Sequence, residues 1–252
     1  MAVKYNDELE NKIIEFYNNG ISPYKMVNLI PELNGKRPSV IYGILKRKGI
    51  KSHKTYPLTE KQKMNRRKYT VDDNFFSVID TEEKAYWLGF IYADGFINTR
   101  ENVIGISISE KDKEHLVKFK NHVNYTGDIK TYKSTGFKDS NYVRLLIRSD
   151  IMKRDLIKLG VLENKTYILK FPTEDKIPNN LVLHFIRGYI DGDGCITYNR
   201  TQKNGNRNFS IKITGTFEMM TNFQKVFKTN IKLEQRYPER NVNNYSLSIG
   251  GN

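Results

Sequence analysis

Two nine-residue stretches decide the fold: Trp87–Gly95 reads WLGFIYADG and Ile186–Gly194 reads IRGYIDGDG. Each stretch ends an apolar segment and closes on Asp-Gly. An apolar segment of helix-forming residues that is followed directly by glycine predicts a helix that ends at the glycine. Thr81 or Asp80 supplies an N-cap for the first helix, and the two glutamates that follow provide an acidic first turn.

Small residues recur four positions apart in both predicted helices. They are Gly89 and Ala93 in the first helix, and Gly188 and Gly192 in the second. A glycine inside a helix costs roughly 1 kcal/mol relative to alanine, and the usual gain is a close approach of two backbones. We therefore expect the two helices to pack directly against each other.

This packing would bring the acidic residues Asp94 and Asp193 close together. Carboxylates at helix C-termini face the negative end of the helix dipole and also repel each other, so divalent cations between them would stabilise the pair. Oxygen ligands completed by water and a substrate phosphate suit Mg²⁺. The first hypothesis is a metal-dependent phosphodiesterase with its site on an internal pseudo-dyad. The alternative is two core helices that happen to end in Asp-Gly, and the repetition disfavours it.

At these residues the chain resembles the LAGLIDADG homing endonucleases. The second copy, GYIDGDG, is close to the family pattern, whereas Tyr92 in the first copy replaces the first acidic residue. The resemblance implies that Asp94 and Asp193 bind Mg²⁺ or Mn²⁺. It also implies that Lys165 polarises solvent or steadies the developing phosphate charge, and that Glu110 helps to hold water at the site.

The composition points to a polyanionic partner. The chain has 252 residues, a formal net charge of +14 and a pI of about 9.6, which favours double-stranded DNA over a membrane surface. We expect no membrane span, because no apolar run is long enough, and no signal peptide. Cys195 is the single cysteine, so we expect no internal disulfide and a cytoplasmic or other reducing compartment.

Residues 1–50 predict a small all-α domain. Helices are expected over Asp7–Asn19, from Pro23 after the cap Ser22 to Ile30, and from about Arg37 to Lys48. Three short helices with a basic third one resemble a helix-turn-helix module, whose last helix enters the major groove. The alternative is a generic three-helix bundle. The candidate DNA contacts on the third helix are Arg37, Ser39, Tyr42, Lys46 and Arg47.

A basic segment follows this domain. Between Lys46 and Lys68 there are ten Lys or Arg and one acid, Glu60, which gives a net charge of +9. We interpret residues 51–74 as a linker or arm that lies along DNA phosphates; the alternative is a solvated basic linker. Its candidate contacts are Arg66, Arg67 and Lys68.

Residues 75–252 predict an α+β domain of two pseudo-symmetric ββαββα repeats, about 75–175 and 176–252, each opened by an Asp-Gly helix. The first repeat is expected to have strands at 96–99, 103–109, 126–132 and 142–148, with helices at 111–123 and 151–159. The second is expected to have strands at 195–200, 208–215, 231–237 and 245–249, with a helix at 217–227. Only SLSIGGN follows Tyr245, so the second repeat is expected to lack its last helix, as in a truncated form or after loss of part of one half.

One face of each predicted sheet is expected to be free, because helices cover only the other face. Alternate side chains on that free face are candidate DNA contacts, and a saddle of two such sheets fits a major groove, as the resemblance implies. The alternative for each residue is an ordinary solvated strand face. The candidates are Asn98, Arg100, Lys130, Tyr132, Arg144, Arg148, Thr197, Asn199, Lys212, Lys232, Gln235 and Arg236.

Two functions follow from these observations. The first is a monomeric, sequence-specific, Mg²⁺- or Mn²⁺-dependent endonuclease of the homing type, which cuts double-stranded DNA. The second is a DNA-binding protein that does not cut, such as a regulator, an intron maturase or a degenerate endonuclease. The two aspartates favour the first function, whereas Tyr92 and the short second repeat favour the second.

Overall fold

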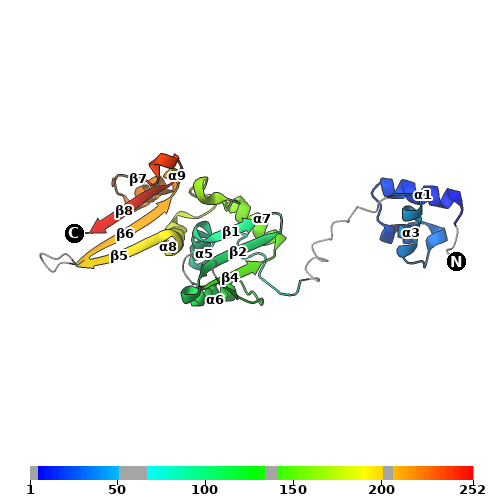
Figure 1. Cartoon of the computed structure of the whole chain (residues 1–252), viewed down its shortest axis with the longest axis horizontal. Helices are drawn as coiled ribbons and strands as arrows, with labels where there is room; N and C mark the ends of the chain where they lie inside the picture. Colours follow the sequence, from blue (N-terminus) through cyan, green and yellow to red (C-terminus); the bar gives the residue numbers. More distant parts are fainter. Residues whose placement is uncertain (1–4, 51–66, 134–140, 201–206, 252) are drawn as a thin grey trace. The chain divides into compact units, whose positions relative to one another are not determined.

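The structure is a computed structural model that describes residues 5–50, 67–133, 141–200 and 207–251 (Figure 1). It divides into two compact units, residues 1–67 and 68–252. Most of the predicted basic arm, including Arg66, lies outside the described residues. Among the described residues, no helix is both long enough and apolar enough to cross a membrane.

The described residues of the first unit form three α-helices around one core, as predicted. The elements are α1 (Asp7–Asn18), α2 (Pro23–Leu29), η1 (Pro31–Leu33) and α3 (Ser39–Arg47). The side chain of Ser22 accepts a hydrogen bond from the Lys25 amide and caps α2. The core includes Ile13, Met26 and Ile44, all fully buried. The third helix begins at Ser39 rather than at Arg37, because Pro38 occupies the N-cap position.

The second unit has the predicted α+β architecture. Its first half contains α5 (Glu82–Ala93), β1 (Gly95–Asn98), β2 (Val103–Ser109), η2 (Glu110–Asp112), α6 (Lys113–His122), β3 (Lys130–Lys133), β4 (Asn141–Ile147), α7 (Asp150–Leu159) and η3 (Lys165–Tyr167). Its second half contains η4 (Asn179–Leu181), α8 (Val182–Asp193), β5 (Gly194–Arg200), β6 (Arg207–Gly215), α9 (Phe217–Phe227), β7 (Glu234–Gln235), η5 (Pro238–Arg240) and β8 (Tyr245–Gly251). The structure describes the last helix of the ββαββα plan, α7, in the first half only.

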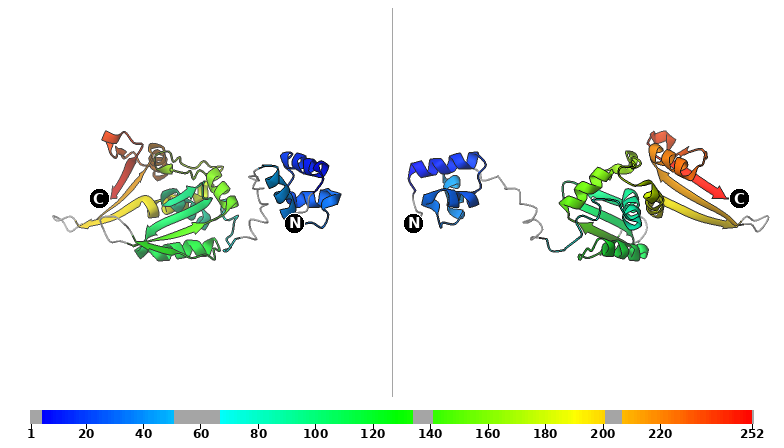
Figure 2. Two further views of the ribbon diagram at one scale, coloured as in Figure 1. Left: turned by 45° about the vertical axis from the view of Figure 1, so that its right-hand side comes forward. Right: turned by 180° about the vertical axis from the view of Figure 1, so that it is seen from behind.

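The two halves form two four-stranded antiparallel sheets with the same topology. The strand orders are β1-β2-β4-β3 and β5-β6-β8-β7. The helices α5 and α8 lie side by side between the sheets and make the most extensive contact between any two elements (Figures 1 and 2). One apolar core runs through both halves and includes Trp87 and Ile91 of α5 and Phe185 of α8.

The pairing of strands allows each residue of the first half to be aligned with one of the second half. Gly95 lies opposite Ile106 and Gly194 lies opposite Ile213, directly after the two Asp-Gly helices. Ile106 and Ile213 in turn lie opposite Leu145 and Leu247. We call two residues equivalent when they lie the same number of positions along the chain from two matched residues, so that Asp94 is equivalent to Asp193.

Two predicted strands are shorter than expected. The strand expected over 126–132 begins at Lys130, because the preceding residues form loop contacts, such as the bond from the Thr126 amide to the Thr70 carbonyl. The strand expected over 231–237 is reduced to Glu234–Gln235. Tyr237 has a φ of +56° and is followed by Pro238, and neither feature continues a strand.

Candidate active site

The helices α5 and α8 approach each other through glycine, as predicted. A Cβ atom built on Gly89 would lie 1.9 Å from the carbonyl oxygen of Phe185, and one built on Gly188 would lie 1.9 Å from the carbonyl oxygen of Tyr86. Gly89 and Gly188 are equivalent, and so are Tyr86 and Phe185, so the contact is symmetric. Any side chain at either glycine would push the two backbones apart.

This close approach places the two Asp-Gly carboxylates at neighbouring helix ends. Asp94 is the C-cap of α5, and Asp193 is the last residue of α8. The Asp94 Oδ2 atom lies 3.4 Å from the position that a Cβ atom on Gly192 would occupy. A Cβ atom at position 192 would also lie 2.4 Å from the Cβ atom of Ala93, so glycine here allows the end of α8 to approach the end of α5.

The two carboxyl groups have raised pKa values. Burial raises the pKa of Asp94 to about 6, the negative charge of Asp193 adds to the rise, and the positive charge of Lys165 opposes it. Asp193 is exposed as a whole residue, yet partial burial of its carboxyl group raises its pKa, against the opposing effects of Lys165 and a hydrogen bond from Tyr189. Each carboxylate is thus less stable as an anion here than in water, and a cation beside the pair would stabilise both.

The ammonium group of Lys165 belongs to this site. Its Nζ atom donates a 2.8 Å hydrogen bond to the carbonyl oxygen of Ala93, at the C-terminal end of α5. Burial lowers the pKa of Lys165, whereas the charges of Asp193 and Asp94 raise it. A single half-buried cation therefore interacts with both carboxylates, one from each half of the unit.

Two open hollows flank the helix ends. Asp94 lines the first together with Asp112, Asp191 and Lys111. Asp193 lines the second. Among the described residues, no group of three or more His, Cys, Asp or Glu side chains is placed to hold a metal ion. A divalent cation at this site would therefore need water or a substrate to complete its ligands.

Two candidate residues predicted to contact DNA lie beside Asp193. Lys212 of β6 and Arg236, which follows β7, line the same hollow as Asp193. Arg236 also lines a neighbouring hollow that contains Lys165 and Tyr189. The second half therefore contributes two cations next to its carboxylate.

Two acidic residues after β2 have different surroundings. Glu110 accepts a 2.8 Å hydrogen bond from the side chain of Asn141 and does not line the hollow that contains Asp94. Asp112, two residues later, lines that hollow and raises the pKa of Asp94. Asp112 was not predicted from the sequence, because residues 109–114, SEKDKE, contain three acidic side chains. Only the short helix η2 determines which of them faces the site.

The residue that departs from the family pattern has a core role. Tyr92 is buried, and its hydroxyl group donates a 2.5 Å hydrogen bond to the carbonyl oxygen of Leu159 at the end of α7. Its equivalent in α8 is Asp191, which accepts a 2.5 Å hydrogen bond from Tyr86 of α5. The Tyr92 bond thus links α5 to α7, whereas the Asp191 bond links α8 to α5.

Several candidate DNA contacts share the open face of the first sheet. The register pairs Lys130 with Arg144, and Tyr132 with Tyr142, so these side chains emerge on the same face. Arg100 and Arg148 are exposed at strand ends. The side chain of Asn98 accepts a hydrogen bond from the Glu101 amide and so closes the turn after β1.

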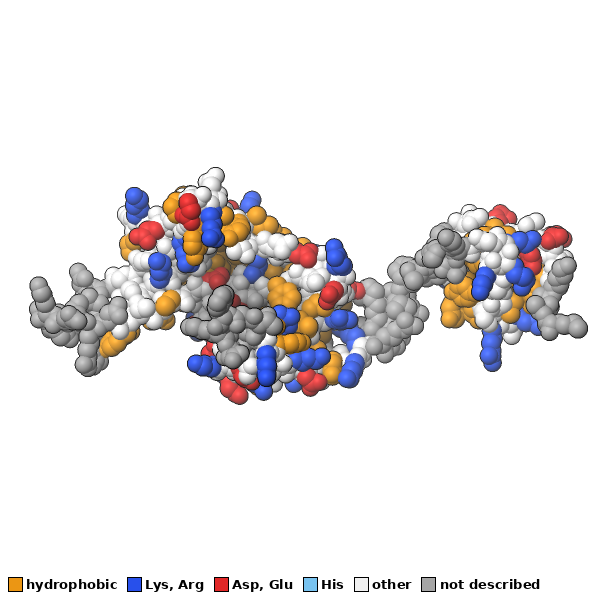
Figure 3. Space-filling view, in the orientation of Figure 1, with side chains coloured by type: hydrophobic (Ala, Val, Ile, Leu, Met, Phe, Trp, Pro, Cys, Tyr) orange, Lys and Arg blue, Asp and Glu red, His pale blue; other side chains and the backbone are white. Residues whose placement is uncertain are grey.

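The second sheet carries the remaining candidates. The Thr197 hydroxyl group is hydrogen-bonded to the Ser210 hydroxyl group on the neighbouring strand. Gln235 and Lys232 are exposed, and Lys232 precedes β7 rather than lying in a strand. Asn199 lies in β5, but its side chain is outside the described residues. Lysine and arginine side chains are spread over both units (Figure 3).

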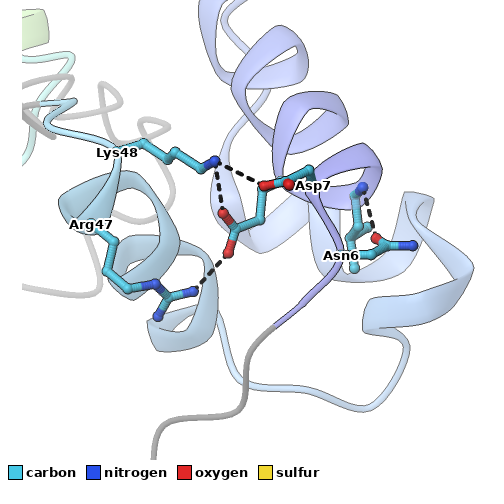
Figure 4. Close-up of polar contacts among 6 residues, drawn as sticks. Asn6, Asp7, Arg47 and Lys48 are labelled. Carbon is cyan, nitrogen blue, oxygen red and sulfur yellow. Dashed lines mark hydrogen bonds and ion pairs between the residues drawn. The ribbon is translucent and has the colours of Figure 1, made fainter.

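In the first unit, most candidate side chains of α3 and the residues before it are exposed. Arg37, Ser39, Tyr42 and Lys46 are exposed. Arg47 is exposed too, but it has a partner within the unit: its guanidinium group lies 2.9 Å from the carboxylate of Glu10, which also lies 3.2 Å from Lys48 (Figure 4).

Of the two described residues predicted in the arm, Lys68 is exposed and its Nζ atom lies 5.0 Å from the ring centre of Tyr69. Arg67 is half-exposed.

The chain is similar to known proteins in structure. No protein-family model and no curated protein matches this chain. Similar solved structures include the LAGLIDADG meganuclease I-AabMI bound to uncleaved DNA, with 12% identity over 66% of this chain and 78% of that one and a TM-score of 0.42. The homing endonuclease I-LtrWI bound to target DNA has 14% identity over 68% and 80% and a TM-score of 0.41. I-GzeII in complex with its DNA target has 11% identity over 68% and 78% and a TM-score of 0.44. These three are LAGLIDADG proteins, the family that the two Asp-Gly helices of this chain resemble.

Proposed function

We propose that this protein is a sequence-specific, metal-dependent endonuclease that cuts double-stranded DNA. One observation carries the proposal: Asp94 and Asp193 end two helices in direct contact, and both carboxyl groups interact with the single ammonium group of Lys165. The net charge of +14 favours a polyanionic substrate. Because one chain supplies both carboxylates, we also propose that it acts as a monomer.

The residues at the site fit a divalent cation of the Mg²⁺ type. Two carboxylates supply hard oxygen ligands, and Mg²⁺ commonly binds through one or two carboxylates together with waters and substrate phosphates. Asp94 and Asp193 would hold Mg²⁺ or Mn²⁺. When bound, such an ion activates water and stabilises the charge on the attacking and leaving oxygens of a phosphodiester.

The side chains around the carboxylates have distinct tasks in this proposal. Lys165 stabilises negative charge that develops on the phosphate, because its ammonium group is half-buried beside both carboxylates. Arg236 and Lys212 hold the DNA backbone near Asp193. The open sheet faces contact the bases, and the first unit binds DNA as a helix-turn-helix module through the exposed residues of α3.

The test replaces each carboxylate by its amide. Asp94→Asn and Asp193→Asn should each reduce Mg²⁺-dependent cutting of a plasmid library by at least about 100-fold, since changes to residues that only support metal ligands already cost 10–100-fold. DNA binding in a gel-shift assay should persist. Asp175→Asn, at an exposed position before α8, is the matched control and should cut like the wild type. Cutting at the wild-type rate by either site variant would reject the assignment.

A second candidate is a DNA-binding protein that does not cut. Two observations favour it: Tyr92 is committed to the core, and Glu110 is directed to Asn141 rather than to the carboxylate pair. In the same assay, wild-type protein that shifts DNA but produces neither nicked nor linear plasmid with Mg²⁺ or Mn²⁺ would establish this candidate instead.

A further inference from the structure

An arginine on the open face of the first sheet is held in a cluster of aromatic rings. The guanidinium carbon of Arg144 lies 5.4 Å from the ring centre of Tyr132, 5.4 Å from that of Tyr142 and 5.7 Å from that of Phe96. The two tyrosine rings are stacked, with centres 5.3 Å apart. All four side chains are half-buried, and they come from three of the four strands of the sheet.

A hydrogen bond fixes the orientation of the guanidinium group. The Nε atom of Arg144 donates to the Ser107 hydroxyl oxygen at 2.7 Å, across the β2–β4 pair. The two terminal nitrogens make no hydrogen bond with any part of the protein that the structure describes. The group is therefore held at one edge, and its other edge, with two parallel N–H donors, is available for a ligand.

The glycine at position 105 completes this arrangement. A Cβ atom built there would lie 2.2 Å from the Phe96 ring, so the ring lies over the bare backbone of β2. The Phe96 ring thus occupies space that a side chain at position 105 would fill. The cluster is thus built by the backbone as well as by the side chains.

At the equivalent positions of the second sheet, the described side chains form no such cluster. The position equivalent to Arg144 is Ser246, which is buried. The positions equivalent to Phe96 and Gly105 are Cys195 and Lys212. The two sheets therefore present different chemistry at the same place: an oriented guanidinium group in the first half, and the flexible cation of Lys212 in the second.

We propose that Arg144 is a specificity-determining residue that recognises a guanine base in the major groove, and that only the first half of the protein makes this contact. The inference rests on the proposed binding of double-stranded DNA. Two parallel N–H donors match the O6 and N7 acceptors of guanine, the commonest specific contact between arginine and DNA. Aromatic contacts and the Ser107 bond keep the guanidinium group in position before DNA binds, which lowers the entropic cost of the contact.

The experiment is a selection from randomised DNA duplexes with the full chain, without divalent cations, so that binding is measured and not cutting. Wild-type protein should enrich an asymmetric site with a strong guanine preference at one position. Arg144→Gln should reduce the preference at that position by roughly 5- to 150-fold, the range for one bidentate contact, and leave the preferences elsewhere unchanged.

Arg148→Gln is the matched control, because it removes the same charge from an exposed position just after the same strand. It should weaken binding to all sequences equally and reduce the slope of log affinity against log salt concentration by about 0.9. Ser107→Ala retains every charge and ring, and it should weaken the guanine preference without changing the salt slope. Thermal unfolding of each variant identifies any that fail to fold.

The outcomes separate this inference from the proposed function. If Arg144→Gln retains the wild-type guanine preference, or weakens all positions equally as Arg148→Gln does, the inference is wrong and the proposed function stands. If the wild-type protein enriches no sequence at all, the proposed sequence-specific binding fails, and the inference fails with it.

Discussion

The two halves of the second unit share one interface and differ in what covers their sheets. At the α5–α8 contact they are nearly identical, with a glycine on each helix against a carbonyl oxygen on the other. In the sheets, Ile97 of β1 is 3% exposed, whereas Ile196 at the equivalent position of β5 is 62% exposed. The symmetric part of the unit thus builds the carboxylate pair, and the asymmetric part makes the two sheets distinct.

The helix α7 accounts for much of this difference. Its buried residues Met152 and Leu156 belong to the apolar core. Its N-terminal turn is hydrogen-bonded to the β1–β2 turn, where Asn102 contacts Asp150 and Lys153. In the second sheet, Ile196 and Tyr198 of β5 and Phe209 of β6 are exposed. The two halves therefore differ at the first strand of each sheet: Ile97 of β1 is buried, whereas Ile196 of β5 is exposed.

The largest expected effect tests the symmetric part. Gly89→Ala and Gly188→Ala should each lower the free energy of unfolding by at least about 4 kcal/mol, because the new methyl group meets a backbone oxygen that cannot move without separating the helices. Urea unfolding measures both. Gly43→Ala in α3, where an added Cβ meets nothing within 4 Å, should instead stabilise its unit by up to about 1 kcal/mol. A difference of more than about 2 kcal/mol between the two site variants would contradict the symmetry.

The second prediction tests the asymmetric part. Ile97→Ala should lower the free energy of unfolding by about 3 kcal/mol, because it opens a cavity under a fully covered strand. Ile196→Ala, the same change at the equivalent position, should change it by less than about 0.5 kcal/mol. Urea unfolding of the two variants gives the comparison directly. Equal losses would show that the second sheet is covered in solution as the first one is.

Local sequence signals predicted most of this architecture. The glycine that follows each Asp-Gly helix, the caps Thr81 and Ser22, and the period of two in β2 each depend on neighbours within a few residues. The close helix packing also followed from the sequence, because small residues four apart have few other uses inside an apolar helix.

Contacts between distant residues could not be predicted in the same way. Arg47 is bound to Glu10, 37 positions away, so its basic character did not reveal that it has a partner within the unit. Likewise, the chain order of three aromatic residues and one arginine gave no sign that they meet on one sheet face. The strand before Tyr237 is short because Tyr237 has a positive φ angle, which a sequence of β-forming residues does not predict.

The third prediction concerns the pH dependence of stability. Because burial raises the folded-state pKa of Asp94 to about 6, above its usual value of 3.8, the folded protein binds more protons than the unfolded chain between these values. The free energy of unfolding should therefore fall as the pH rises from about 4 to about 6, by about 1–2 kcal/mol after allowance for solvent screening. Asp193 contributes in the same direction.

Urea unfolding at several pH values without metal measures this loss. Asp94→Asn should flatten the dependence and be more stable than the wild type at pH 7.5, since the amide carries no charge to repel Asp193. Added Mg²⁺ should raise the stability of the wild type at pH 7.5 and have little effect on the variant. A wild-type stability that rises between pH 4 and pH 6 would contradict the raised pKa.

The smallest effect comes from a hydrogen bond that breaks the symmetry of the helix interface. Tyr86→Phe removes the hydrogen bonds of this hydroxyl group to Asp191 and His115, and it should cost about 1 kcal/mol, because the Asp191 carboxylate is exposed and water can replace the donor. The equivalent residue, Phe185, shows that a phenyl ring fits this position. The reverse change, Phe185→Tyr, should cost more, because it places a hydroxyl group at a fully buried position. The residue equivalent to Asp191 is Tyr92, whose hydroxyl group already donates to Leu159, so no carboxylate takes the place of Asp191 there. Urea unfolding of the two variants therefore separates the shape of the interface, which the halves share, from its polar contacts, which differ. A larger loss of unfolding free energy for Tyr86→Phe than for Phe185→Tyr would contradict this prediction.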